Sequence, residues 1–536
     1  MSDTVTVVMS DPATHEAVAA APGRARRSPP AWMLPGGAVA AVLVPYLVLA
    51  ARMGLYGGHM FSASDYSLMD LQVHRALRWQ ELLGVYDRFG WHHPGPLYLY
   101  LTSFAARVLG ADHGPQALMV TAALIDGAAP AATVWVVGRL AGRWAALGAA
   151  GALAVVAVAV GHDPMSAAWT PYVVVLPCLL VCVLSLAAAR GSVTWLAAAA
   201  LVASFCVETD VGTLPLVAVV VGGALVVVVW RRLSGSPVGG GWPAVALAAV
   251  TGLVWLPALW QQVDGPDGNL AAITRFFLAH HTHDGLLDGA VTTGTAAATV
   301  VGVHVPNFEM NAGPGLWKIG LIAAGLGLVA GLALWAGERT AAALAALGLA
   351  GVGVAVLAGA DVVGPGFSYL LAWAAAPAAL GLVAVGVLVA RIGSRHSVAA
   401  AGVGLIVATA VGGLLATEVL VAPASSYSDP RVGAVWRLVA ARAESQPRER
   451  LGLSFTGFFS AMVVAGIADE LDLRGIPFGV SRQLAFGFGP GSALPPGRWL
   501  VVADPGKPLP PGTARIGVAA GMDVGWRLSP PPGWKR

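Results

Sequence analysis

The residues of this chain that are best suited to chemistry lie between positions 64 and 96, in the segment SDYSLMDLQVHRALRWQELLGVYDRFGWHHPGP. The segment gathers acids, arginines, histidines and aromatic side chains, although only 11% of the 536 residues are charged. A carboxylate can take a proton from a hydroxyl group, and arginine and histidine can bind a phosphate. We therefore expect acid–base or phosphate chemistry in this segment.

Two aspartates, Asp65 and Asp70, lie at the start of a helix that we expect to run to about Leu83. A spacing of five residues separates them by roughly 140° around the helix, so they need not face one site. Asp65 has two open interpretations, as a helix N-cap or as a catalytic base. Asp70 fits better as a supporting carboxylate or a metal contact than as the base.

The turn that follows combines Arg88, Trp91, His92 and His93. Arg88 can pair with a phosphate, and either histidine can donate a hydrogen bond to it. Trp91 can stack on a sugar or an isoprenoid chain. The structural alternative is that Trp91 anchors the membrane interface while the histidines face water. The density of these residues directly before an expected interfacial helix favours function.

A second polar segment lies between residues 261 and 315, where Arg275 is a further candidate for phosphate binding. The run HHTHD contains residue types that bind metals, although it has no established coordination spacing. A solvated polar loop is the simpler interpretation of that run. The weak metal-ligand candidates are His280, His281, His283 and Asp284.

Three other acids stand out against the apolar background. Glu208 and Asp210 lie in VETDVGTLP, between two apolar runs, where they could bind acceptor hydroxyls or a cation, or cap a helix. Asp126 lies near the middle of an apolar run. A charge there is costly in a membrane, so Asp126 should be protonated, paired or directed into a polar cavity.

The apolar runs predict a multi-pass α-helical membrane protein. A hydrophobic fraction of 57% and a mean hydropathy of +0.73 exclude an ordinary soluble domain. Residues 32–51 are uncharged and long enough to cross a bilayer. Ten further spans bring the expected number to about eleven: 115–138, 144–160, 171–189, 192–207, 211–230, 242–260, 316–337, 340–360, 369–390 and 398–421.

Charge predicts the orientation of these spans. Arginines gather at alternate loops, which the positive-inside rule assigns to the cytoplasm. The acids Asp65, Glu208, Asp210 and Asp361 fall on the other side, which is therefore the outer face of the cytoplasmic membrane. The net charge of +3 comes largely from the inner arginines and gives no reason to expect nucleic acid.

We expect three parts in the chain. Residues 1–30 form a disordered cytoplasmic tail, and residues 31–423 form the transmembrane domain with outer loops at 52–114 and 261–315. Within the first loop, residues 95–109 are too short to span and predict a helix at the outer interface. Residues 424–536 predict a small extracytoplasmic α/β domain, with strands at 451–455 and 499–503 and a helix at 460–473.

The chain resembles the GT-C superfamily of membrane glycosyltransferases. The likeness lies in a first span, an outer loop that opens with Asp65, and an HHPGP turn before a short interfacial helix. The segments LPALWQQVDGPDGNLAAITRFF and GRWAALGAAGA add to it. It covers most of residues 32–420, and the Ala/Gly/Val-rich, Lys-poor composition is similar to that of actinobacterial members.

This resemblance implies an inverting transfer from a polyprenyl-phosphate sugar to an envelope glycan, glycolipid or protein, outside the cytoplasmic membrane. Asp65 matches the loop aspartate that acts as general base in the superfamily. Many members have adjacent acids there, whereas Tyr66 follows Asp65 in this chain, so the second carboxylate and a divalent cation stay open. A transporter or flippase of lipid-linked saccharides is the alternative, although most acids lie in loops rather than mid-span.

Overall fold

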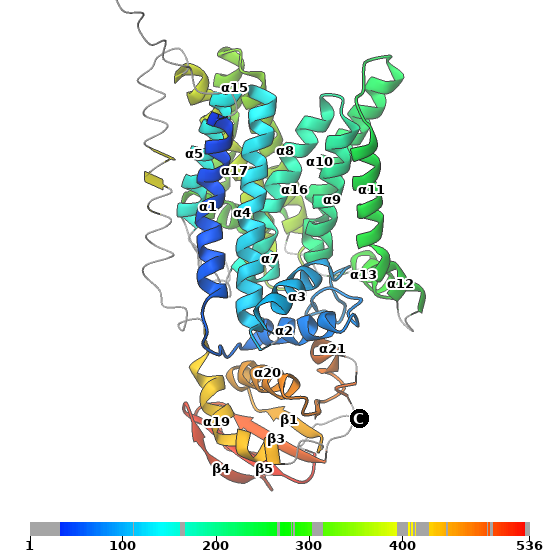
Figure 1. Cartoon of the computed structure of the whole chain (residues 1–536), viewed down its shortest axis with the longest axis vertical. Helices are drawn as coiled ribbons and strands as arrows, with labels where there is room; N and C mark the ends of the chain where they lie inside the picture. Colours follow the sequence, from blue (N-terminus) through cyan, green and yellow to red (C-terminus); the bar gives the residue numbers. More distant parts are fainter. Residues whose placement is uncertain are drawn as a thin grey trace, which may run out of the picture.

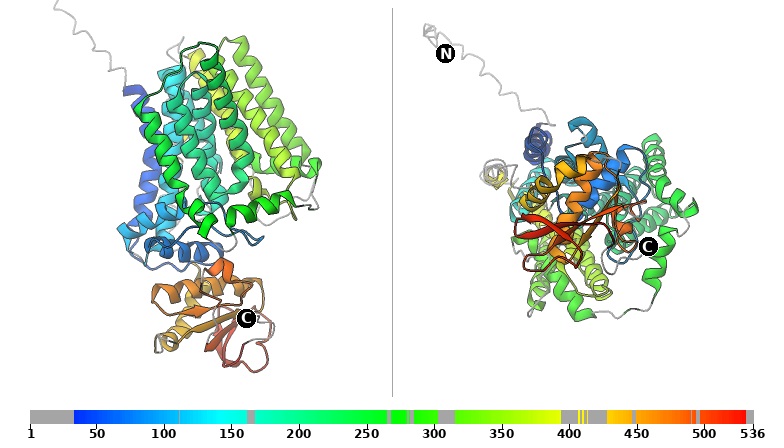
Figure 2. Two further views of the ribbon diagram at one scale, coloured as in Figure 1. Left: turned by 90° about the vertical axis from the view of Figure 1, so that its right-hand side faces the viewer. Right: turned by 90° about the horizontal axis from the view of Figure 1, so that it is seen from below.

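The computed structural model describes residues 33–110, 112–160, 167–264, 268–279, 281, 285–302, 315–393, 406–407, 409–410, 413, 428–445, 449–489, 491–493 and 497–530. A bundle of long helices forms one end of the molecule, and a small α/β domain forms the other (Figure 1). Short helices lie between them, at the end of the bundle that faces the α/β domain (Figure 2). The polar segment at residues 64–96 belongs to this middle layer.

The bundle matches the predicted spans closely in position. Eight apolar stretches in the described residues are long enough to cross a membrane, so the chain is a multi-pass membrane protein, although the predicted number of about eleven is not confirmed. The predicted span at 398–421 lies mostly outside the described residues. The bundle helices are α1 (Met33–Gly54), α4 (Gly114–Ala141), α5 (Arg143–Val160), α7 (Thr170–Val173), α8 (Val175–Ala189), α9 (Val193–Thr209), α10 (Leu214–Leu233), α11 (Trp242–Val254), α12 (Leu256–Asp264), α15 (Leu316–Trp335), α16 (Arg339–Ala360) and α17 (Ala375–Gly393).

Small residues let these helices approach closely. Gly148 of α5 lies against Gly386 of α17, and a Cβ atom on either glycine would collide with the backbone of the other. Lipid supplies no hydrophobic driving force between spans, so close packing of small residues is a main source of their association. The Ala- and Gly-rich composition therefore has a structural use in the bundle.

The layer below the bundle carries the polar loops. It contains α2 (Ser64–Leu77), α3 (Leu97–Leu109), η1 (Val211–Thr213), α13 (Asn269–Leu278), α14 (Leu286–Ala297), η2 (Ala298–Val301) and η3 (Ser368–Ala374). The short helix predicted at residues 95–109 is α3. The helix predicted to reach about Leu83 ends at Leu77, because Trp79 adopts a positive φ of 59° and turns the chain back. The Trp79 ring then stacks on Tyr100 of α3.

The C-terminal domain is a five-stranded mixed sheet with helices packed on it. Its elements are α19 (Pro430–Ser445), β1 (Leu451–Phe455), α20 (Phe458–Leu473), β2 (Phe478–Gly479), α21 (Ala485–Phe488), β3 (Arg498–Ala503), β4 (Ala514–Ala519) and β5 (Met522–Arg527). The strand order is β2-β1-β3-β5-β4, with β1 parallel to β2 and β3, and β5 antiparallel to β3 and β4. The three predicted elements are present within two residues, and the β4–β5 hairpin was not predicted.

The two ends of the molecule meet where α20 packs against α2. His59 Nε2 lies 2.7 Å from Glu470 Oε1, and His74 Nδ1 lies 2.9 Å from Asp472 Oδ2. Ser62 also donates a hydrogen bond to Asp469. We call this contact, made by residues 59–78 with α20, the α2–α20 junction.

The topology can be tested by cysteine labelling, because Cys178, Cys182 and Cys206 are buried and should add little background. Gln80, Ser234 and Ser529 are exposed positions. In intact cells, a membrane-impermeant maleimide should label Gln80→Cys and Ser529→Cys, and should label Ser234→Cys only after permeabilisation. The wild-type chain is the control. Labelling of Ser234→Cys in intact cells, with protection of the other two positions, would show that the orientation is the reverse of the predicted one.

Candidate functional site

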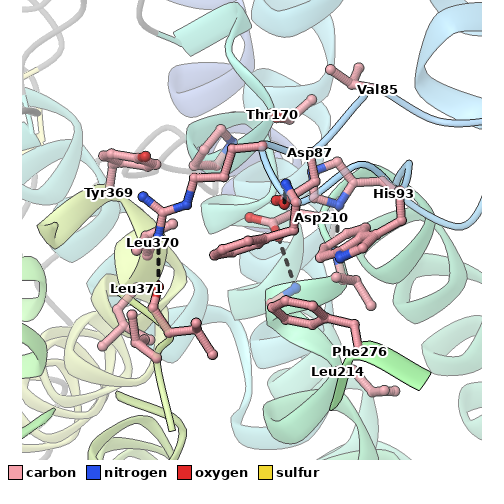
Figure 3. Close-up of a pocket in the computed structure, with 18 of the residues that line it drawn as sticks. Val85, Asp87, His93, Thr170, Asp210, Leu214, Phe276, Tyr369, Leu370 and Leu371 are labelled. Atoms are coloured by element: carbon pink, nitrogen blue, oxygen red, sulfur yellow. Dashed lines mark hydrogen bonds between the residues drawn. The ribbon is translucent and has the colours of Figure 1, made fainter. Parts of the chain in front are cut away.

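A cavity of about 450 Å³ lies in the middle layer, between the loop after α2 and the ends of several bundle helices. Figure 3 shows Asp87, His93 and Asp210 on its wall, with Tyr369 and Leu370 across from them. Its polar and aromatic lining comes from six separate stretches of the chain: Asp65, Tyr86, Asp87, Arg88, Phe89, Trp91, His93, Trp169, Thr170, Asp210, Phe276, Phe277, Asp361 and Tyr369.

Asp65 lies in the first turn of α2 but does not act as its N-cap. The N-cap is Ala63, which makes no side-chain capping bond. The Tyr86 hydroxyl donates to Asp65 Oδ1 at 2.5 Å, and Trp169 also hydrogen-bonds the carboxylate. Burial raises the pKa of Asp65, while these two hydrogen bonds oppose the rise.

The backbone before Asp65 is unusual. Ser64 has a φ of 57°, in the left-handed region that residues with a Cβ rarely adopt. This conformation starts α2 abruptly after the extended residue Ala63. Non-glycine residues in this region often mark functional sites, where packing of the surroundings holds the strained backbone.

Three further carboxylates share the cavity with Asp65, those of Asp87, Asp210 and Asp361. Asp210 follows α9, and its Oδ1 accepts a hydrogen bond from the Gly212 amide at 2.8 Å. Burial is the main reason that the pKa of Asp210 is raised to about 7; the Gly212 hydrogen bond opposes this rise, and the nearby charge of Asp87 contributes to it. Burial also raises the pKa of Asp87 to about 6. No role was predicted for Asp87 from the sequence, although its position between Tyr86 and Arg88 was a usable signal.

Arg88 is the basic residue on the cavity wall. One guanidinium nitrogen donates to the Val363 carbonyl at 3.0 Å, and the group lies over the Phe89 ring at 4.8 Å. An arginine has five N–H donors, so this carbonyl contact leaves donors for an anionic ligand. The positive charge of Arg88 also interacts electrostatically with Asp87 and Tyr369.

Trp91 and His93 form the inner wall. His93 Nδ1 accepts a hydrogen bond from the Val211 amide at 3.1 Å, which links the loop after α2 to η1. Burial lowers the pKa of His93 to about 3, so it stays neutral and cannot act as a cation for phosphate. Trp91 packs edge-on against His93 and beside Phe276, and its Nε1 has no partner in the described part of the chain.

His92 points away from the cavity. Its Nε2 lies 3.1 Å from the Phe486 carbonyl of α21, while its backbone exchanges two hydrogen bonds with the Asn269 side chain. Burial lowers the pKa of His92 to about 4. These contacts join the loop after α2 to α13 and the C-terminal domain, and His92 is a positioning residue in this structure.

Other predicted site residues also lie outside the cavity lining. Arg275 is exposed on α13, and its Nε contacts the carbonyl of Ala271. Glu208 is buried at the end of α9, where its carboxylate packs against Gly95 just before α3. His281 lies 2.9 Å from the Phe276 carbonyl. The remaining metal-ligand candidates, His280, His283 and Asp284, lie outside the described residues.

Asp70 belongs to a different cluster. It is fully buried on the face of α2 that meets the C-terminal domain, and burial raises its pKa to about 7. Its neighbours are His74 and Asp469, which lie at the α2–α20 junction. The structure therefore separates the two predicted aspartates, with Asp65 at the cavity and Asp70 at the junction.

The helical bundle, the short helices below it and the C-terminal domain together have the GT-C fold. The structure of ArnT from Cupriavidus metallidurans bound to undecaprenyl phosphate is similar, with 13% identity and a TM-score of 0.55 over 92% of this chain and 99% of ArnT. The apo state of ArnT aligns with 14% identity and a TM-score of 0.43, over 92% of this chain and 98% of ArnT.

An oligosaccharyltransferase from Archaeoglobus fulgidus, in complex with Zn and sulfate, aligns with 12% identity and a TM-score of 0.43, over 87% of this chain and 68% of that protein. No protein-family model matches the sequence, and neither does any curated protein. The relationship is therefore visible in the fold rather than in the sequence.

The raised pKa of Asp210 makes a testable prediction about stability. Between the ordinary value of 3.8 and the folded value of about 7, the native state binds more protons than the unfolded state, so stability falls as pH rises. Asp210→Asn keeps the oxygen that accepts from Gly212 and removes the charge. The unfolding free energy of the variant relative to wild type should therefore rise by about 1 kcal/mol or more between pH 5 and pH 8.

Thermal unfolding of both proteins in detergent at several pH values measures this difference. Asp112→Asn is a control, because Asp112 is exposed and outside the cavity. An equal change for Asp210→Asn at pH 5 and pH 8 would mean that Asp210 does not titrate in this range.

Proposed function

We propose that the chain transfers a sugar from a polyprenyl-phosphate donor to a hydroxyl group of an envelope glycan, glycolipid or protein. The observation that carries this proposal is the cavity that combines the half-buried carboxylate of Asp65 with the guanidinium of Arg88. Its position next to apolar bundle helices suits a substrate with a lipid tail. The similar ArnT structure contains undecaprenyl phosphate, which supports a donor of this class.

Asp65 is the proposed general base. The acceptor oxygen attacks the anomeric carbon while the bond to the phosphate oxygen breaks, and Asp65 takes the proton of the acceptor hydroxyl. The lipid phosphate leaves with the electron pair of the broken bond, and a single displacement of this kind inverts the anomeric centre. Burial raises the pKa of Asp65 towards the working pH, and a base is most efficient when its pKa lies close to that pH.

Arg88 is the proposed phosphate contact. Negative charge grows on the departing phosphate, and an arginine beside it stabilises that charge with directional N–H donors. The aromatic rings of Phe89, Trp91 and Phe276 provide apolar surface for the sugar and the first isoprene units. Asp87 and Asp210 can accept hydrogen bonds from sugar or acceptor hydroxyls. His93 accepts a hydrogen bond from the Val211 amide and so stabilises the cavity wall.

We place the reaction on the outer face of the cytoplasmic membrane, with the C-terminal domain outside. The alternating arginine loops support this orientation. No nucleotide-binding glycine loop is present in the sequence, which fits a lipid-linked donor. His92 connects the loop after α2 to the C-terminal domain through the Phe486 carbonyl, so this domain supports the position of the loop.

Transport of a lipid-linked saccharide is a second candidate function, because Asp126 is buried within α4. Its Oδ1 has no hydrogen-bond partner among the described residues. A buried carboxyl in a span is a feature of many transporters. Transport would require Asp126 and not Asp65, so matched Asn variants of the two residues distinguish the functions.

The role of Arg88 can be tested with undecaprenyl phosphate as the ligand. Arg88→Ala should weaken its binding by roughly tenfold or more, because a charge-assisted contact is lost. Arg88→Lys should recover only part of the affinity, since an ammonium lacks the planar fork. Arg275→Ala is the matched control, because it removes an exposed arginine that does not line the cavity. Equal affinity in Arg88→Ala and wild type would exclude the contact.

The catalytic assignment can be tested with Asp65→Asn. Asn keeps the oxygen that accepts from Tyr86 but is not a base, so transfer should fall by roughly a hundredfold or more while binding of undecaprenyl phosphate persists. Envelope glycans and polyprenyl-phosphate sugars should be compared in a deletion strain that expresses each variant. Asp126→Asn is the parallel variant. Normal glycans with Asp65→Asn and a defect with Asp126→Asn would favour transport.

A further inference from the structure

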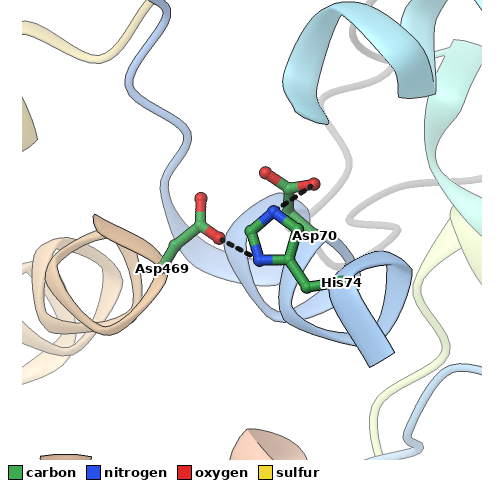
Figure 4. A group of neighbouring side chains, drawn as sticks. All are labelled: Asp70, His74 and Asp469. Carbon is green, nitrogen blue, oxygen red and sulfur yellow. Dashed lines mark ion pairs between the residues drawn. The ribbon is translucent and has the colours of Figure 1, made fainter. Parts of the chain in front are cut away.

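A second cluster of polar side chains lies at the α2–α20 junction, away from the cavity. Asp70 and His74 are on α2, and Asp469 is on α20 (Figure 4). The three residues are 0%, 4% and 2% exposed, respectively. One potential ligand atom from each lies within 4.8 Å of those of the other two. No residue of the cluster lines the cavity.

Several atoms of this cluster lack a hydrogen-bond partner within the described residues. They are both oxygens of Asp70, Oδ1 of Asp469 and Nε2 of His74. His74 Nε2 lies 3.9 Å from Asp70 Oδ1, too far for a hydrogen bond. A proton shared between the two aspartates would satisfy their oxygens but would leave His74 Nε2 unpaired. Buried polar atoms without partners are costly, so these atoms indicate a missing ligand.

The other nitrogen of His74 points to the nature of that ligand. Nδ1 lies 2.9 Å from Asp472 Oδ2, so it carries a proton and donates it to this carboxylate. Nε2 then presents a lone pair towards Asp70. Asp469 Oδ1 lies 3.9 Å from Nδ1, so the imidazole has an aspartate of the cluster near each of its nitrogens. A carboxylate that accepts a hydrogen bond from one imidazole nitrogen is usual where the other nitrogen binds a metal.

The surroundings orient the three side chains. Asp70 and His74 are four residues apart, so they share one face of α2. Ser62 donates to Asp469 Oδ2 at 3.0 Å, which leaves Oδ1 for a metal. Gly114 faces the Asp70 carboxylate, and a Cβ atom there would collide with it. Tetrahedral zinc ligands are about 3.4 Å apart. His74 Nε2 and Asp70 Oδ1, at 3.9 Å, need to approach by about 0.5 Å, and the ligand atom of Asp469 must approach from within 4.8 Å.

We propose that Asp70, His74 and Asp469 bind a divalent transition metal of the Zn²⁺ class, which joins α2 to α20. One imidazole nitrogen and two carboxylate oxygens suit zinc, whereas Ca²⁺ and Mg²⁺ prefer oxygen ligands alone. The metal offsets the charge of two buried carboxylates and links the membrane domain to the C-terminal domain. Its role is structural: it holds the helix whose first turn carries Asp65. The site does not depend on the proposed sugar transfer.

Metal content of the purified full-length chain tests this site directly. After treatment with a chelator, the protein is incubated with Zn²⁺, Mn²⁺ or Mg²⁺, desalted and analysed by elemental mass spectrometry. Wild type should retain about one zinc per chain and little magnesium, and zinc should raise its melting temperature by several degrees. Asp70→Asn, His74→Gln and Asp469→Asn should each lose the bound zinc and the thermal shift.

His59→Gln is the matched control. His59 lies at the same junction and pairs with Glu470 at 2.7 Å, but it is not a ligand of the cluster. This variant should keep its zinc. Absence of stoichiometric zinc from the reloaded wild type, or retention of zinc by Asp70→Asn and Asp469→Asn, would overturn the proposal. Because both aspartate variants preserve side-chain size, the test stands even if His74→Gln does not fold.

Discussion

The burial of α2 between two domains is the constraint on which the rest of the site depends. One side of this helix packs against α3 and α4, and the other packs against α20. Nine of its residues are buried, although it contains acids, a glutamine and a histidine. Buried polar groups need partners, so α2 has few positions in which its side chains are satisfied. The Gln72 side chain donates a hydrogen bond to the Gly84 carbonyl, and His74 hydrogen-bonds Asp472. With α2 held in this position, Asp65 lies at the cavity.

The loop after α2 depends on the same constraint. Its backbone is hydrogen-bonded to the Gln72 side chain on one side and to the Asn269 side chain on the other. His93 accepts a hydrogen bond from η1. The neutral histidines act as hydrogen-bonding groups in this arrangement, since protonation would place an unpaired charge in a buried site. Arg88 is therefore the main cation of the cavity wall. The same wall carries four carboxylates, whose negative charge is costly without a cation or a hydroxyl donor.

Several features were predictable from local patterns. Long apolar runs predicted the bundle helices, and the short run before Leu109 predicted α3, because length decides whether a helix can cross a bilayer. The strands at Leu451 and Trp499 were predicted from their apolar character. The β4–β5 hairpin was not predicted, because β4 is largely exposed. The turn between the two strands contains Ala520 and Gly521, both with positive φ angles, and an Ala-Gly pair is not a typical sequence signal for a hairpin turn.

The sequence by itself determined the class of protein and the segment that holds the candidate site, because hydropathy and charge act through local residue types. It could not separate Asp65 from Asp70, since both lie on one short helix and only its packing decides which domain each faces. Asp87, Asp210 and Tyr369 come together from distant stretches, and Asp469 reaches His74 across almost 400 residues. Tertiary structure decided these contacts, because the free energy of pairing buried polar groups arises only when separate elements pack and exclude water.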